Sequence, residues 1–443
     1  MKHWNPVRVS TAALIVAGLL QAPAYAQSLK DAVDMVVKTS PDVLVETNQR
    51  LANDEAVKNA RGGYFPKVDL LAGTGNEWSD NTTTRIAGYN DWRKLNRQEA
   101  QITLTQMLFD GFAVSSEVGR NKARVESAAW KVLGTSEAMG LRGVEAYLNV
   151  LRNQELVRLA KENLDAHVRT MDQINIRSTG GVGRKSDQEQ SAARLGLARA
   201  NLVSAEANLR DAEINFQRIV GARPIQLSKP VAPESSLIPK TPDEASQTAV
   251  SNHPILKSAN ADVKAAEYQR EAAKSTLYPR FDLELGYGNN KNLDGVKGDN
   301  DEKWAMLRMR YNLFRGGSDM ARISETTHLT NEAREVMSRT QRQVEESTRL
   351  SWNAYTSAAE RLPAMKTHAD MSMATSESYA KQFNLGQRTL LDLLDSVNES
   401  FTSQMNYTSA MYLEMFARYR VLADMGQLLN YLGVQPPVEA WLP

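Results

Sequence analysis

An internal duplication restricts the possible folds of this 443-residue chain more than any other feature. The stretch "DAVDMVVKTSPDVLVETNQRLANDEAVKNARGGYFPKVDLLAGTGN" begins at Asp31. It is matched 213 residues later by "EASQTAVSNHPILKSANADVKAAEYQREAAKSTLYPRFDLELGYGN", which begins at Glu244. The same offset aligns Pro41 with Pro254, and Gly73 with Gly286. Matches in the same order at one fixed spacing indicate two copies of a single structural unit.

The first 26 residues have the pattern of a signal peptide. A basic start with Lys2 and Arg8 precedes a short apolar run and the cleavage pattern Ala24-Tyr25-Ala26. We therefore expect the mature chain to begin at Gln27, with an uncleaved anchor as the alternative. The first repeat then covers 27–228, a proline-rich linker "KPVAPESSLIPKTP" covers 229–242, and the second repeat covers 243–443.

Each repeat contains two segments with apolar residues at every second position. In "FDLELGY" the alternate residues are Phe281, Leu283, Leu285 and Tyr287, and "MLRMRYNL" continues the pattern. This period is typical of strands with one apolar and one polar face. It predicts strands at about 66–76, 100–109, 279–288 and 304–314, with polar loops over 79–96 and 289–302. The aromatic residues near the strand ends suit an interfacial girdle: Trp78, Tyr278, Tyr287 and Trp304.

The segments 115–176 and 318–385 predict very long helices, because they contain no proline except Pro363. The segments that follow them predict return helices, so each repeat forms a helical hairpin, with tips near 180–187 and 385–389. In the first return segment leucine or phenylalanine recurs every seven residues, with alanine or isoleucine three residues later, which is a coiled-coil pattern. Those positions are Leu195, Leu202, Leu209 and Phe216, with Ala198, Ala205, Ala212 and Ile219. An ordinary helix-bundle core is the alternative.

Four amphipathic strands cannot form a closed sheet in a membrane by themselves. An open sheet edge in lipid leaves backbone groups unsatisfied, and membrane barrels of the outer-membrane type have at least eight strands. We therefore expect two or three copies of the chain to combine their strands.

This layout resembles the TolC family of outer-membrane channel-tunnel proteins over essentially the whole mature chain. The most specific segments are the tips, "GGVGRKSDQEQSAARLGLARANL" from Gly180 and "FNLGQRTLLDLLDSVNE" from Phe383. They are similar to the type I secretion branch, which includes exporters of agglutination proteins and large adhesins. The resemblance implies a mainly α fold with a membrane β-barrel: a homotrimer with a twelve-stranded barrel and a periplasmic α-helical tunnel. It also implies an outer-membrane location in contact with lipid, and two partners, a periplasmic adaptor and an inner-membrane ABC transporter or other pump.

Two acids at the second tip, Asp392 and Asp395, are the candidate gate residues. Asp392 fits a capping pattern with Thr389, and Ser186 with Glu189 repeats that pattern at the first tip. Asp395 lies beyond the cap but shares a helix face with Asp392. In a three-fold assembly each aspartate would become a ring of three, and acidic rings favour cations.

The resemblance assigns roles to further tip residues. Asp392 and Asp395 match the family's periplasmic constriction, Arg388 matches a residue of the closed-state latch, and Ser186 and Asp187 match its partner positions. Phe383 departs from the family pattern, because a latch tyrosine is expected there; Gln382 or Gln387 could replace its hydroxyl. The expected adaptor-docking tips are Gly181, Val182, Gly183, Arg184, Leu385, Gly386 and Gln387.

The resemblance thus implies an exit duct for type I secretion, passing a protein such as a large adhesin or RTX-like substrate. The alternatives are a small-molecule efflux component and a soluble periplasmic coiled-coil scaffold. An enzyme is not expected, because the five histidines show no metal-ligand spacing and the chain has no cysteine. Neither a cofactor nor a metal is expected. The 53 basic and 52 acidic side chains nearly cancel, so nothing indicates a nucleic-acid partner.

Overall fold

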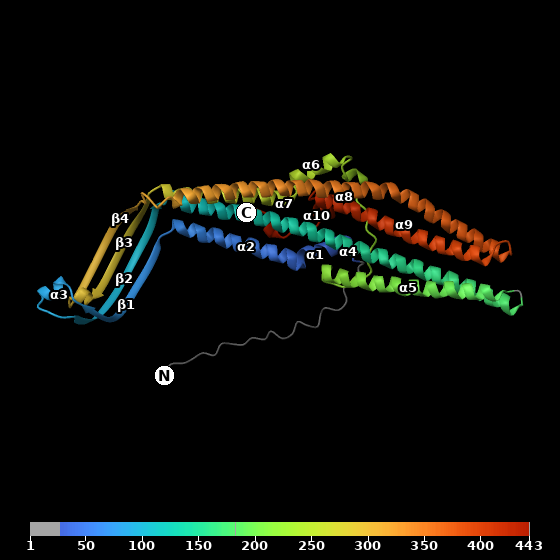
Figure 1. Ribbon diagram of the computed structural model, residues 1–443, viewed down its shortest axis with the longest axis horizontal. Coiled ribbons are helices and arrows are strands. Elements are labelled where there is room, and N and C mark those ends of the chain that lie inside the picture. The colour runs from blue at the N-terminus through green and yellow to red at the C-terminus, as the bar shows by residue number, and fades with distance from the viewer. Residues whose placement is uncertain (1–26, 182, 443) are drawn as a thin grey trace, which may run out of the picture.

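An elongated body of helices carries a β-sheet at one end (Figure 1). The computed structural model describes residues 27–181 and 183–442, so the predicted signal peptide and Val182 lie outside the described residues. Of the predicted fold class, mainly α with a membrane β-barrel, the mainly helical part is confirmed, and the strands of the described chain form a small sheet.

The two repeats contribute corresponding elements. In the first repeat these are α1 (Leu29–Thr39), α2 (Pro41–Arg61), β1 (Lys67–Ser79), α3 (Thr82–Ile86), β2 (Arg93–Phe109), α4 (Ala113–Thr179) and α5 (Lys185–Val220). In the second they are α6 (Pro242–Asn252), α7 (Pro254–Lys274), β3 (Arg280–Lys291), β4 (Asp299–Arg310), α8 (Ser318–Asn384), α9 (Leu390–Asp424) and α10 (Leu428–Leu432). The aligned prolines Pro41 and Pro254 each begin a helix, where the fixed φ of proline is favourable.

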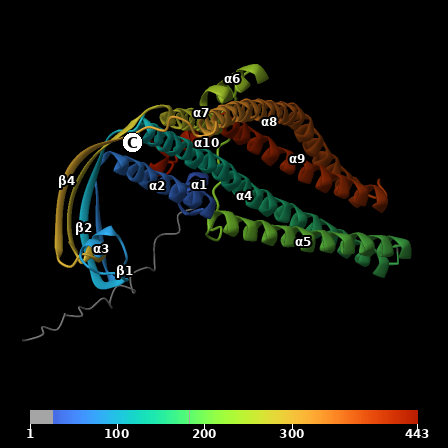
Figure 2. The ribbon, with the colours of Figure 1, turned by 60° about the vertical axis from the view of Figure 1, so that its left-hand side comes forward.

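The strands form one antiparallel sheet in the order β1-β2-β3-β4 within the described chain, and the sheet curves strongly (Figure 2). The contact between β2 and β3 joins the two repeats. The predicted loops over 79–96 and 289–302 are too long, since the strands continue into these polar stretches. The predicted last strand, 304–314, is shifted, because β4 ends at Arg310. Backbone pairing does not need apolar side chains, so the hairpins extend beyond the alternating pattern.

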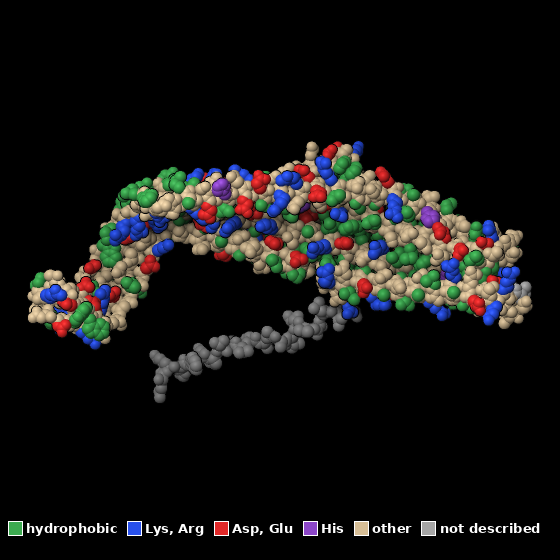
Figure 3. Space-filling view, viewed as in Figure 1, with side chains coloured by type: hydrophobic (Ala, Val, Ile, Leu, Met, Phe, Trp, Pro, Cys, Tyr) green, Lys and Arg blue, Asp and Glu red, His purple; other side chains and the backbone are tan. Residues whose placement is uncertain are grey.

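One face of the sheet is apolar and exposed. Residues that pair directly across strands point to the same face, and the register places Leu70, Ile102, Tyr287 and Lys303 together. The apolar side chains on this outer face are 40–76% exposed: Val68, Leu70, Ile102, Leu285, Leu307 and Met309. On the side seen in Figure 3, hydrophobic side chains gather where the sheet meets the helices.

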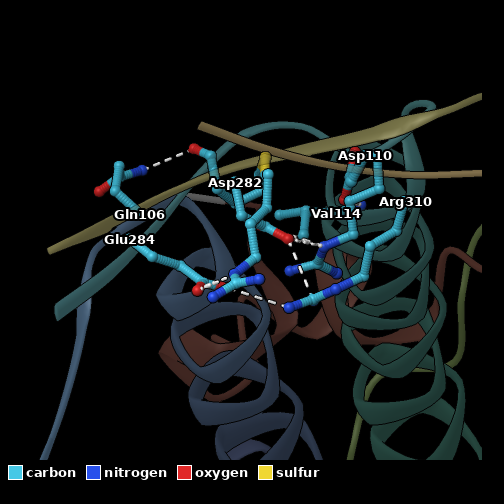
Figure 4. Close-up of polar contacts among 9 residues, drawn as sticks. Gln106, Asp110, Val114, Asp282, Glu284 and Arg310 are labelled. Carbon is cyan, nitrogen blue, oxygen red and sulfur yellow. Dashed lines mark hydrogen bonds and ion pairs between the residues drawn. The ribbon is translucent and has the colours of Figure 1, made fainter. Parts of the chain in front are cut away.

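The opposite, inner face carries charges that neutralise one another. Asp282 is fully buried and accepts a 2.9 Å hydrogen bond from Arg280 Nε (Figure 4). Glu284 accepts from Arg308 and, at 2.9 Å, from Arg310 Nη2. Trp304, predicted as a girdle residue, lies on this inner face instead, where its ring covers Gly286.

The helical hairpins α4/α5 and α8/α9 form the long body (Figure 1). α4 and α8 each have 67 residues, which at 1.5 Å per residue is about 100 Å. Ala198, Ala205 and Ala212 are buried, as both the coiled-coil pattern and the helix-bundle alternative predict. Pro363 lies inside α8, and that helix bends along its length (Figure 2). Among the described residues, none of the helices combines the length and the apolar composition of a membrane-spanning segment.

The predicted linker is irregular and is held against the helices by side-chain hydrogen bonds. The Tyr419 hydroxyl donates to the Val231 carbonyl at 3.0 Å, and Arg418 Nη1 donates to the Pro233 carbonyl at 2.8 Å. Trp352 Nε1 donates to the Pro239 carbonyl at 2.9 Å.

Candidate gate at the hairpin tips

The two hairpins end side by side at the pole opposite the sheet (Figures 1 and 2). Gly181 and Gly386 adopt φ of +77° and +74°, a conformation that side chains other than glycine rarely adopt. At Gly183 a Cβ atom would lie 2.8 Å from the Ser178 backbone, so the turn requires a glycine there too. The described residues of the predicted docking set lie at these two turns or directly beside them: Gly181, Gly183, Arg184, Leu385, Gly386 and Gln387.

Asp392 completes a capping box with Thr389, the N-cap residue of α9, as the sequence pattern predicts. Thr389 Oγ1 accepts from the Asp392 amide at 3.2 Å, and Asp392 Oδ2 accepts from the Thr389 amide at 3.3 Å. The capping pattern predicted for Ser186 with Glu189 at the first tip is wrong. α5 begins at Lys185, with Arg184 as its cap residue and no side-chain capping bond, so Ser186 already lies within the first helical turn.

Asp395 is half-exposed and points toward the first hairpin. Its Oδ1 accepts a 2.7 Å hydrogen bond from Arg194 Nη2 on α5. Leu390 and Leu394 on the same helix are buried, so the predicted division between a leucine seam and an acidic face is confirmed. The carboxylate of Asp395 is thus partly neutralised within the protomer.

Arg388 contacts its own hairpin. Its Nε donates to Gln382 Oε1 at 2.9 Å, and its guanidinium lies 4.3 Å from the centre of the Tyr379 ring. The Arg388 Nη1 and Asp392 Oδ2 atoms are 3.9 Å apart. Within the described residues of one protomer, no hydrogen bond or ion pair joins Arg388 to Ser186 or Asp187.

Phe383 connects the hairpins through its ring and its backbone. The ring is buried in an apolar cluster with Ile174, Leu390, Leu393 and Leu394. The Arg177 guanidinium lies 4.4 Å from the ring centre, and its Nη2 donates to the Phe383 carbonyl at 3.3 Å. A guanidinium over an aromatic face is an attractive arrangement, so Arg177 joins the hairpins where no tyrosine hydroxyl is present.

Sequence reasoning missed Arg177 and Arg194. They contact residues 206 and 201 positions away, respectively. The duplication predicts that the two hairpins lie side by side, but it does not indicate which of their many charged side chains meet.

His167 is a buried residue of α4 and lies near Arg194. Burial, and secondarily the neighbouring Arg194 charge, lower the pKa of the His167 imidazole, so it is neutral near pH 7. The described residues contain no group of three or more His, Cys, Asp or Glu side chains that could hold a metal ion. The features that the structure shows at the tips are ion pairs, an apolar cluster and exposed turns.

Comparisons with known proteins match this architecture. The family model described as outer membrane efflux protein matches residues 32–222 and 245–419, one segment within each predicted repeat. Outer membrane efflux protein BepC of Brucella suis is 24% identical over 86% of this chain and 82% of its own length. Alkaline protease secretion protein AprF of Pseudomonas aeruginosa is 24% identical over 94% of this chain and 86% of its own length.

Among solved structures, the outer-membrane channel OprN has the same fold, with a TM-score of 0.76. The match covers 90% of both chains at 18% identity. The chain therefore belongs to the outer membrane efflux protein family, and it is an outer-membrane channel protein whose helical hairpins extend into the periplasm.

Proposed function

We propose that this chain forms the exit duct of a type I secretion system. It would pass a protein, such as a large adhesin or RTX-like substrate, from an inner-membrane ABC transporter and its periplasmic adaptor to the exterior. The observation that carries the proposal is the open sheet with an exposed apolar face, continued by two helical hairpins. Similarity to AprF, a protein named for the secretion of alkaline protease, favours protein cargo.

The duct requires a homotrimer. β1 and β4 each have one unpaired edge within the described residues, and such edges are unfavourable in lipid. Three copies pairing β4 with β1 of the next copy would close a barrel of twelve strands, which is within the range of such barrels. The six hairpins would then line a tunnel about 100 Å long, the length of α4 and α8.

The gate lies at the tips in this proposal. Asp392 and Asp395 would form rings around the three-fold axis, where the carboxylates would favour cations. Arg177 and Arg194 would hold the two hairpins of one protomer together. Arg388 would contribute to the latch by contacting Ser186 and Asp187 of a neighbouring protomer, since it does not reach them within its own.

The turns would dock the adaptor. Leu385 is 73% exposed at the second turn, so a partner can reach its side chain. An adaptor that binds the separated hairpins more tightly than the joined ones would open the gate by shifting this equilibrium.

Single cysteines test the proposal cleanly, because the chain has none of its own. Leu385→Cys, labelled with a photo-crosslinker in living cells, is expected to capture a periplasmic adaptor and co-isolate an ABC transporter. Leu413→Cys on α9 is the matched control, since Leu413 is also exposed but lies away from the tips. Deletion of the gene is expected to remove a large protein from the medium.

The alternative is small-molecule efflux; BepC is named as an efflux protein, and its name gives no cargo. It predicts capture of an adaptor that serves a different pump, an unchanged set of secreted proteins, and greater sensitivity to toxic compounds. That combination would contradict the type I assignment. A soluble scaffold is not supported, because the chain is an outer-membrane protein.

A further inference from the structure

The two hairpins of the sheet have the same register. Lys67 of β1 pairs with Thr105 of β2. Arg280 of β3 pairs with Arg310 of β4. These positions correspond in the two repeats: Arg280 follows Lys67 by the offset of 213 residues, and "LFDGF" and "LFRGG" begin three residues after Thr105 and Arg310. The duplication therefore extends to individual strand pairs, with β3 corresponding to β1 and β4 to β2.

Inside the chain, the two hairpins meet along β2 and β3, where Ile102 pairs with Tyr287 on the outer face. The outer edges of β1 and β4 have no strand partner within the described residues. Pairing of β4 with β1 of another copy would repeat the internal contact, since these strands correspond to β2 and β3. Transferred to the two edges, the pair of Ile102 and Tyr287 becomes Leu307 and Thr74, which also lie on the outer face.

β4 is shorter than its counterpart β2 at the end next to the helices. β2 continues past Thr105 to Phe109, and among the described strands its partner there is β3 alone. β4 ends at Arg310, and the corresponding residues 311–314 form no strand. Residues 311–314 therefore lack the kind of partner that β3 supplies to β2.

An aromatic contact joins the two repeats at this same end of the sheet. Phe109 of the first repeat packs edge-on against Tyr278 of the second, with ring centres 6.4 Å apart. The corresponding residues, Phe314 and Phe65, are 85% and 66% exposed. In the described part of one protomer, neither of these two rings packs against another aromatic ring. Each ring thus lacks the aromatic neighbour that its counterpart has.

We propose that a second copy of the chain pairs with the β4 edge in the register of the internal β2–β3 contact. Leu307 lies directly opposite Thr74 of the next copy, residues 311–314 extend β4, and Phe314 packs against Phe65 of that copy. The seam, where β4 of one copy meets β1 of the next, thus repeats the contact between the two halves of one chain. This inference rests on the homotrimer proposed above and adds the register and the contacts of its seam.

The test is disulfide cross-linking in isolated outer membranes, because the chain has no cysteine of its own. Directly opposite Cβ atoms on neighbouring strands are about 4.5–5.5 Å apart and diagonal ones about 7–8 Å, whereas a disulfide needs about 4 Å. Oxidation of Leu307→Cys with Thr74→Cys is therefore expected to give covalently closed trimers, which reduction returns to monomers. Within one chain β1 and β4 are three strand spacings apart, about 14 Å, so this bond forms only between copies.

The matched controls combine Leu307→Cys with Ala72→Cys or with Asn76→Cys. Ala72 and Asn76 lie on the same face of β1 as Thr74, but about 7 Å from it along the strand. Both controls are expected to remain mainly monomeric in SDS after oxidation. Cross-linking through either of them in place of Thr74 overturns the proposed register and leaves the homotrimer intact.

The mass of the parent in mild detergent, without cross-linking, separates the remaining outcomes. A trimeric mass without a bond between Leu307→Cys and Thr74→Cys overturns the seam alone, and a monomeric mass overturns the homotrimer as well. Should this double variant fail to assemble, Met306→Cys with Gly75→Cys must cross-link in its place. These two residues form the adjacent directly opposite pair of the same register, corresponding to Gln101 and Gly288.

Alanine variants test the contact between the two rings. Phe65→Ala and Phe314→Ala are each expected to lower the temperature at which the assembled protein dissociates in SDS. Because both remove the same contact, the double variant is expected to lose no more than the more sensitive single variant. Ile86→Ala is the control, since Ile86 is 82% exposed on α3 at the other end of the sheet. The ring contact is overturned if the two losses add, or if Ile86→Ala loses as much.

Discussion

At the scale of single residues, Glu137 is a carboxyl group buried inside the helical body. It lies on α4, is 6% exposed, and accepts a 3.3 Å hydrogen bond from the Leu429 amide at the start of α10. Burial raises the pKa of Glu137 to about 7, although the amides of Leu429 and Leu428 oppose that rise. The Glu137 carboxyl group therefore holds its proton more tightly in the folded protein than in the unfolded chain.

The pH dependence of stability follows from this preference. The pKa of Glu137 in the folded protein exceeds the ordinary value of 4.5. The contribution of Glu137 to the free energy of unfolding is therefore complete below pH 4.5 and is lost as pH rises toward 7. The loss is on the order of 3 kcal/mol in the free energy of unfolding. Glu137→Gln is expected to remove this loss of stability between low and neutral pH. Urea unfolding in detergent at pH 5 and pH 7.5 would measure the free energy of unfolding for both proteins.

Glu145→Gln is the control for this prediction, since Glu145 is an exposed carboxylate on the same helix. It is expected to leave the difference between the two pH values unchanged. An unchanged difference in Glu137→Gln would mean that the buried carboxyl is not the source.

The pair of Arg194 and Asp395 permits a test of the proposed gate by charge balance. Arg194→Gln removes a positive charge 2.7 Å from Asp395, so it is expected to increase cation preference by about twofold, the scale of an exposed ion pair. Asp395→Asn is expected to decrease it. Reversal potentials of single channels in a salt gradient would measure both effects.

The double variant Arg194→Gln with Asp395→Asn completes a cycle and is expected to return close to the parent selectivity. A change of the same sign in both single variants would show that selectivity arises elsewhere in the channel.

At the scale of elements, the starts of α5 and α9 give a matched pair of substitutions. Thr389→Ala removes the capping box of α9 and is expected to cost about 1 kcal/mol locally. Amide hydrogen exchange over the first turn of α9 is expected to rise about fivefold. Ser186→Ala makes the equivalent change at the first tip, where no capping bond exists, and is expected to leave exchange in α5 unchanged.

Those two helix starts also show what the sequence could predict. The pattern at Thr389 and the pattern at Ser186 are equally good matches, but capping depends on where the helix begins, and α5 begins at Lys185. The duplication, the paired strands and the long hairpins were predictable, because repeat and side-chain period act along the whole chain. The ends of the strands were not predictable, because polar hairpins such as 289–302 pair through the backbone alone.

Contacts between the repeats were also outside the reach of sequence patterns. Phe383 could be recognised as lacking a hydroxyl, but its stacking with Arg177 depends on the relative position of α4 and α8. Helix position is set by packing over the full length of the hairpins, which a local pattern does not encode.

At the scale of the whole molecule, the sheet separates two environments. Its outer face exposes apolar side chains, and its inner face carries the paired charges of Asp282, Glu284 and three arginines. A wall of this kind suits lipid on one side and water on the other. The same curved sheet leaves its edges unpaired in the described protomer, so the proposed closure by further copies is linked to exposure of the sheet to lipid.

Leu70 and Leu71 test this separation, because they are adjacent leucines of β1 on opposite faces. Leu70 pairs with Ile102 on the outer face, and Leu71 pairs with Gln101 on the inner face. Both are more than half exposed in the protomer, so neither substitution disrupts its packed core. Leu70→Arg places a charge against lipid and is expected to cost up to about 2–4 kcal/mol, reducing the heat-modifiable assembled protein in outer-membrane fractions. Leu71→Arg places the same charge against water and is expected to assemble like the parent. Equal losses in both variants would contradict a sheet with one lipid-facing side.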